Sequence, residues 1–153
     1  MTSLMTRLMR RATGRAVLLV PLLGLLLGVP GQAEAGIVAR VSVSGQRMDV
    51  YVDGAPRYSW PVSTARRGYR TPTGTFKPQA LGVWHRSTRY SGSPMPHSIF
   101  FHGGYAIHGS YEVSRLGTPA SHGCVRLHPS AAAELFSLVR QYGAANTVIQ
   151  IGN

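Results

Sequence analysis

The residues best suited to covalent chemistry gather in one segment of the chain. Within 27 residues stand four histidines and the only cysteine, namely His102, His108, His122, His128 and Cys124. A thiol attacks a carbonyl carbon as its thiolate, so it needs a nearby base, and imidazole titrates close to neutral pH. We therefore expect an ionised, accessible sulfur atom beside an imidazole, which is the arrangement of a cysteine-nucleophile enzyme.

The densest part of this segment is the run Ser121–Leu127, SHGCVRL. Gly123, directly before Cys124, allows a close backbone approach or a conformation that other residues avoid. An exposed turn at this point would direct backbone N–H groups toward a developing oxyanion. The alternative is a structural cysteine, buried as a small hydrophobe with Val125 and Leu127 on the core face of a strand. An unpaired thiol among histidines in an exported protein favours the reactive interpretation.

The elements that must position these residues are mainly strands. Apolar and polar residues alternate over 37–43 and over 48–53, and this period of two is typical of half-buried strands. Ser44-Gly45 and Asp53-Gly54 fall where hairpin turns are needed. The sequence therefore predicts a β-meander that continues through Tyr58–Thr64.

One helix is predicted in the C-terminal half. Pro129 suits the first helical position, an apolar stripe with helical spacing ends at Tyr142, and Gly143 terminates it. Alternation resumes over 147–151 and predicts a closing strand. The expected fold class is mainly β with this single helix.

Length and composition restrict the classes of function. A chain of 153 residues with one cysteine holds one small domain and no internal disulfide framework. Its 44% hydrophobic and only 14% charged residues argue against global disorder. Without residues 1–35, the formal net charge is +8, from 12 Lys and Arg and 4 Asp and Glu. Such a domain is attracted to polyanions, including acidic polymers of the cell envelope.

Residues 1–35 have the composition of a signal peptide. Four arginines precede an apolar stretch of 14 residues, Ala16 to Val29, and small residues up to Ala35 supply a cleavage site. The apolar stretch is short for a membrane span, which needs about 20 residues; an uncleaved anchor helix is the alternative. We expect residues 36–153 to be exported to the periplasm or cell wall and to be peripheral to the membrane at most.

Two motifs resemble the L,D-transpeptidase catalytic domain, also called the YkuD domain. Ile107–Gly109, followed after a spacer by Ser121–Leu127, is similar to the family signature H-G…S-H-G-C-x-[R/N]. Weaker support comes from three further segments in the family's order, Pro61–Thr64, Thr71–Phe76 and Met95–Phe101. The resemblance spans about 38–152 and implies a β-sandwich or open barrel with one helix.

The resemblance also implies roles for the motif residues. Cys124 matches the nucleophile, and His108 matches the base, with its ring held by a backbone carbonyl near Gly109. His122 matches the histidine that shapes the site. Gly123 is expected to donate its backbone N–H to the oxyanion together with that of Cys124. The substrate-binding positions implied are Arg126 and Ser121.

The reaction that the resemblance implies is acyl transfer on peptidoglycan stem peptides, without a metal or another cofactor. The thiolate attacks the third residue of a tetrapeptide stem, D-alanine leaves, and an amine resolves the thioester. That amine belongs to a second stem peptide or to an envelope protein, and water in its place would make the chain an L,D-carboxypeptidase. Carbapenem-type β-lactams are expected to acylate the same thiol. The arginines expected to hold stem-peptide carboxylates, or otherwise to form a solvated surface, are Arg66, Arg67, Arg70, Arg86 and Arg89.

Three rival classes remain open on the residues alone. A zinc hydrolase would use His102, His108, His122 and Cys124 as ligands, although their spacing fits no common zinc pattern. A non-catalytic basic module would bind envelope polymer or nucleic acid, and its binding would survive replacement of the cysteine. An NlpC/P60-like hydrolase places its cysteine before its histidine, which is the reverse of the order here. We favour the transpeptidase, with no nucleic-acid partner.

Overall fold

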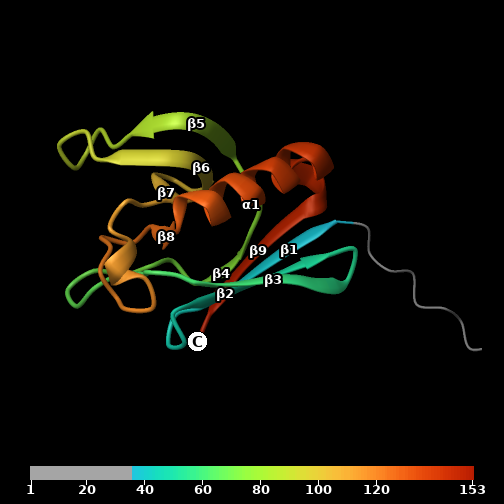
Figure 1. The fold of residues 1–153 in the computed structure, drawn as a ribbon, viewed down its shortest axis with the longest axis horizontal. Helices are drawn as coiled ribbons and strands as arrows, with labels where there is room; N and C mark the ends of the chain where they lie inside the picture. The colour runs from blue at the N-terminus through green and yellow to red at the C-terminus, as the bar shows by residue number, and fades with distance from the viewer. Residues whose placement is uncertain (1–35) are drawn as a thin grey trace, which may run out of the picture. The chain divides into compact units, whose positions relative to one another are not determined.

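The computed structural model describes residues 36–153, so the predicted signal peptide, residues 1–35, lies outside the described residues. Within 36–153 the chain forms nine strands, one α-helix and two short 3₁₀-helices (Figure 1). The predicted fold class, mainly β with one helix, is confirmed. In chain order the strands are β1 (Ile37–Ser42), β2 (Arg47–Val52), β3 (Ala55–Pro61), β4 (Gly74–Phe76), β5 (Ala80–Arg86), β6 (Pro94–His102), β7 (Tyr105–Gly109), β8 (Val125–Leu127) and β9 (Thr147–Gly152).

The first sheet contains the predicted meander. Its order is β3-β2-β1-β9-β4, with β1, β2 and β3 antiparallel to their neighbours in the meander. Asp53 and Gly54 have φ values of +50° and +79°, and positive φ at both central residues suits the tight hairpin between β2 and β3. The closing strand β9 pairs in parallel with β1, which places it in the middle of this sheet.

The second sheet has the order β5-β6-β7-β8 and carries the chemistry. Strands β5, β6 and β7 are antiparallel, whereas the short β8 pairs in parallel with β7. Periodicity did not predict β6 and β7. Both are buried along most of their length, and a strand covered on both faces has no polar alternation to reveal it.

The two sheets are joined beside the end of β8. The segment after β3 makes isolated bridges from Ser63 to Arg126 and from Ala65 to Ser121. The Ser63 side chain is fully buried and donates a hydrogen bond of 2.6 Å to the Thr118 carbonyl. The polypeptide that follows the first sheet is thereby fixed against the segment that precedes β8.

Helix α1 (Pro129–Tyr142) covers one side of the second sheet (Figure 1). The His128 side chain accepts the Ser130 N–H at its start, and Gly143, with φ of +86°, ends it as predicted. The helix packs against β6 and β7, and its buried residues, Ala131, Ala132, Leu135, Phe136 and Val139, join one core with both sheets. No helix within 36–153 combines the length and apolar character that a bilayer crossing requires.

Candidate active site

The parallel pairing of β7 and β8 brings the two key residues together. His108 lies opposite Arg126 in the β-ladder, and Cys124 precedes Arg126 by two positions. Paired residues of a β-ladder share a face, so Arg126 projects from the same face as His108, and Cys124 stands one residue before β8 begins. All three line one cavity of about 640 Å³. Cys124 is partly exposed there, so its sulfur is reachable.

The His108 ring is fixed in one orientation and one tautomer. Its Nδ1 lies 2.7 Å from the Gly109 carbonyl oxygen. A carbonyl only accepts hydrogen bonds, so Nδ1 must carry the proton and Nε2 of the neutral ring is left as the proton acceptor. Gly109 itself is closely packed, because a Cβ there would lie 3.0 Å from Pro96 and 3.1 Å from the Pro129 Cα.

Burial keeps both reactive groups neutral near pH 7. The pKa of His108 is lowered to about 4, mainly by desolvation and to a smaller extent by the charge of Arg126, although the hydrogen bond with Gly109 acts in the opposite direction. Desolvation also raises the pKa of the Cys124 thiol, against a backbone hydrogen bond with Ala106 and the charge of Arg126. The expectation of an ionised sulfur in the resting state is therefore wrong. The pair is a neutral thiol and a neutral imidazole.

The turn before β8 is held by the Ser121 hydroxyl. This hydroxyl donates a hydrogen bond of 2.6 Å to the Cys124 carbonyl and accepts one of 3.0 Å from the Gly123 N–H. Ser121 is 1% exposed. The Ser121 hydroxyl thus holds the turn, and the Gly123 N–H, which was expected to face an oxyanion, is bonded to it in this structure. The Cys124 N–H takes no part in the hydrogen bonds by which the Ser121 hydroxyl holds this turn.

Gly123 is required by its conformation and its surroundings. Its φ is +134°, and a Cβ at this position would lie 2.3 Å from the Tyr105 ring and 2.9 Å from the Arg70 carbonyl oxygen. A side chain would therefore displace the turn from Tyr105, and the adjacent Cys124 with it.

Arg126 connects the reactive pair to a carboxylate at the rim. Its guanidinium lies 2.9 Å from Glu112, and only 17% of the Arg126 side chain is exposed. Its backbone N–H and carbonyl both bond to Ser63. The arginine is thus fixed at both its backbone and its side chain, and it lines the cavity together with Cys124.

His122 belongs to an aromatic cluster at the cavity. Its ring stacks on Tyr90 with centroids 4.2 Å apart and meets the edge of Tyr69 at 4.7 Å. Desolvation and the charges of Arg66 and Arg126 lower its pKa. His122 thus contributes to the site through these ring contacts. Tyr69 comes from the segment before β4, and Tyr90 comes from the segment after β5.

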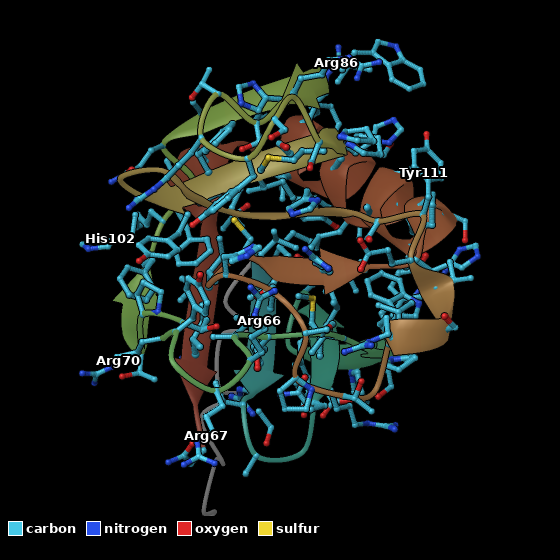
Figure 2. All side chains as sticks on the ribbon, turned by 90° about the vertical axis from the view of Figure 1, so that its left-hand side faces the viewer. Arg66, Arg67, Arg70, Arg86, His102 and Tyr111 are labelled. Atoms are coloured by element: carbon cyan, nitrogen blue, oxygen red, sulfur yellow. The ribbon has the colours of Figure 1, made fainter. Side chains whose placement is uncertain are left out.

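The structure separates the five arginines that the sequence placed near the cleft. Arg66 and Arg89 line the cavity, whereas Arg67, Arg70 and Arg86 do not. In the view of Figure 2, Arg66 lies near the middle of the molecule, and Arg67 and Arg70 extend outward at its edge. Four further residues line the cavity without having been predicted from the sequence: Tyr90, which stacks on His122, and His85, Ser110 and Glu112.

Of the four residues considered as zinc ligands, His108, His122 and Cys124 line the cavity. His102 does not, because it is exposed beside Phe76. In the part of the chain that the structure describes, no three His, Cys, Asp or Glu residues come together in a way that would hold a metal ion.

The arrangement of motif, strands and cavity agrees with a comparison against family models. Residues 36–151 match the model of the L,D-transpeptidase catalytic domain, YkuD. The chain belongs to this family. The match covers nearly all of the described residues, so the resemblance first suggested by two short motifs extends to the whole domain.

Solved L,D-transpeptidase structures share the fold. The enzyme from Stackebrandtia nassauensis has a TM-score of 0.66 at 26% identity, over 78% of this chain and 57% of its own. The enzyme from Xylanimonas cellulosilytica has a TM-score of 0.64 at 27% identity, over 78% of this chain and 62% of its own. The enzyme from Mycobacterium smegmatis has a TM-score of 0.68 at 23% identity, over 76% of this chain and 58% of its own. The chain thus spans less than two thirds of these proteins. No curated protein gave a significant match.

The neutral thiol of this L,D-transpeptidase domain predicts a characteristic pH dependence. Because burial raises the pKa of Cys124 and lowers that of His108 to about 4, the thiolate fraction should fall continuously as the pH falls from 9 to 5. The rate of Cys124 alkylation by iodoacetamide should follow this fall. A rate that stays level from pH 8 to pH 5 would instead indicate a preformed thiolate–imidazolium pair.

The packing around Gly123 predicts a large effect of one methyl group. Gly123→Ala should lower the free energy of unfolding by about 3 kcal/mol or more, from backbone strain together with overpacking against Tyr105. Gly117→Ala is the matched control, because Gly117 has φ of +85° but nothing within 4 Å of its Cβ position. It should lose only about 1–2 kcal/mol. Equal losses in urea denaturation would show that the Tyr105 contact is unimportant.

Proposed function

We propose that this chain is a peptidoglycan L,D-transpeptidase in which Cys124 is the nucleophile and His108 is the base. Its family membership supports an acyltransferase. The observation that carries the assignment to residues is that Cys124 and His108, which the pairing of β7 and β8 brings together, line the same cavity. The proposed donor is a tetrapeptide stem that ends in D-alanine.

The first half-reaction is acylation of the thiol. As Sγ bonds to the carbonyl carbon of the third stem residue, its proton passes to Nε2 of His108, which the Gly109 contact keeps unprotonated. The negative charge on the carbonyl oxygen is stabilised by the Cys124 N–H. The carbon–nitrogen bond then breaks, D-alanine takes the proton from the imidazolium, and a thioester remains.

The second half-reaction reverses these roles. An amine attacks the thioester carbonyl and loses a proton to His108, and the departing sulfur recovers that proton as the new amide forms. A second stem peptide or an envelope protein supplies the amine. The open cavity, with the partly exposed Cys124 in its lining, allows such a second molecule to reach the thioester.

The proposed activity predicts the effect of two substitutions on turnover of a purified disaccharide-tetrapeptide. Cys124→Ala should abolish release of D-alanine and formation of a carbapenem adduct, because the attacking atom is gone. His108→Ala should slow the reaction by about 10²–10⁴-fold. His102→Ala is the control, because this exposed histidine lies outside the cavity. Mass spectrometry of the products measures all three.

The products also distinguish the alternatives. A crosslinked dimer identifies a transpeptidase, and a tripeptide alone identifies the L,D-carboxypeptidase. A Cys124→Ala variant that still releases D-alanine would contradict the role of the cysteine. Binding of peptidoglycan without any turnover by the wild type would instead support the non-catalytic module.

We also propose that the domain works outside the cytoplasm, in the periplasm or cell wall. The support is the order of arginines, apolar stretch and small residues within 1–35. Expression of the full chain should yield a mature protein that begins at Gly36. N-terminal sequencing of the secreted material tests this, and a protein that retains residues 1–35 in the membrane fraction would identify an uncleaved anchor.

A further inference from the structure

The lining of the cavity has an excess of positive charge. It contains three arginines, Arg66, Arg89 and Arg126, and one carboxylate, Glu112. Glu112 pairs with Arg126 at 2.9 Å. Neither Arg66 nor Arg89 forms a salt bridge with any carboxylate of residues 36–153. Two guanidinium groups at the mouth of the cavity are thus left without a counter-ion.

The other carboxylates of the domain are engaged elsewhere. Asp49, Asp53 and Glu134 complete the acidic residues of 36–153, and each accepts a hydrogen bond from a group outside the cavity lining. Each acidic side chain of residues 36–153 thus has another partner, and none forms a salt bridge with Arg66 or Arg89. Arg66 and Arg89 are therefore free to pair with an anionic group of a bound molecule.

The two arginines are held at the site by aromatic rings. The guanidinium of Arg66 lies 4.8 Å from the centroid of Tyr69, and that of Arg89 lies 6.0 Å from the centroid of Tyr90. Both tyrosines contact the His122 ring, and His122 precedes the nucleophile by two residues. A cation over an aromatic face is oriented by that face, unlike an arginine on an ordinary solvated loop.

The backbone adds a second restraint on Arg66. Its N–H donates a hydrogen bond of 2.9 Å to the Ser121 carbonyl, in the turn that carries Cys124. The position of Arg66 and the position of the nucleophile are therefore set by the same turn. The fall in the pKa of His122, caused in part by Arg66, agrees with this proximity.

We propose that Arg66 and Arg89 form a carboxylate-binding pair that selects acyl donors with free carboxylates. This inference rests on the proposed function and specifies its substrate class. A tetrapeptide donor always has the terminal carboxylate of D-alanine, and two arginines accommodate a second carboxylate from a neighbouring residue. Stem peptides whose other carboxylates are amidated are then poor donors for this domain.

The charge of the pair is tested first without any peptide. Cys124 is alkylated in separate experiments by iodoacetate, which is an anion, and by iodoacetamide, which is its neutral analogue. The intrinsic reactivity of the thiol affects both rates equally, so the ratio of the two rates reports the effect of the reagent's charge. The double variant Arg66→Gln/Arg89→Gln should lower the iodoacetate-to-iodoacetamide ratio on the order of fivefold at low salt. Arg66→Lys/Arg89→Lys should retain most of the ratio.

A matched control removes two charges of the same loop from outside the cavity. Arg67→Gln/Arg70→Gln makes the same change in net charge, but neither residue lines the cavity, and both extend away from Arg66 in Figure 2. This variant should lower the ratio much less than Arg66→Gln/Arg89→Gln does, because its side chains extend away from the cavity into solvent, where water and salt screen their charges. Equal effects of the two double variants would overturn the proposal of a local pair.

Donor selection is tested with two disaccharide-tetrapeptides that differ only in amidation of their non-terminal carboxylates. The wild type should have a kcat/KM about tenfold higher for the free acid, and Arg66→Gln/Arg89→Gln should lose most of this preference. Equal use of both donors by the wild type would overturn the inference and leave the proposed function intact. If neither donor reacts, the proposed function fails, and the alkylation ratio alone decides whether the pair binds carboxylates.

Discussion

The site depends on one tightly held turn, Ser121–Cys124. The Ser121 hydroxyl closes it by bonding to the Cys124 carbonyl and the Gly123 N–H, and the Ser121 backbone is bonded to Thr64 and Arg66. These contacts fix Cys124 directly before β8, and the parallel pairing of β8 with β7 brings it to the cavity that His108 also lines. Gly123 has no space for a side chain, so the packing around it also restricts the turn. The buried Ser121 hydroxyl stabilises this arrangement by its two hydrogen bonds.

Charge is distributed unevenly over the cavity. Desolvation raises the pKa of Cys124 against the opposing charge of Arg126, whereas desolvation and Arg126 both lower the pKa of His108, so both groups are held in their neutral forms. Cations that bind aromatic rings stand at the rim, where water still solvates them. This separation avoids the large cost of burying an unpaired ion, and it leaves the rim able to attract anions over a distance.

Sequence reasoning succeeded where the signal was local. Alternation identified β1, β2 and β9, the Pro129 and Gly143 signals delimited α1, and the motif identified the family. It failed where burial or distant contacts decide the outcome. Alternation could not reveal β6 and β7, because both their faces are covered. The neutral thiol follows from desolvation by the fold, and the role of Ser121 from hydrogen bonds to residues two and three positions away, so neither could be read from residue types.

The neutral pair and the cationic rim together constrain the order of events. A donor with two carboxylates would bring negative charge into the cavity when it binds to Arg66 and Arg89, and nearby negative charge disfavours a thiolate. In a mechanism that begins from a preformed thiolate, binding of the donor would then lower the fraction of thiolate just before the attack. Transfer of the thiol proton to Nε2 of His108 during attack avoids this difficulty, because it requires a neutral imidazole, and the low pKa of His108 supplies one throughout the physiological range. Burial of the pair thus favours a proton transfer that is concerted with bond formation.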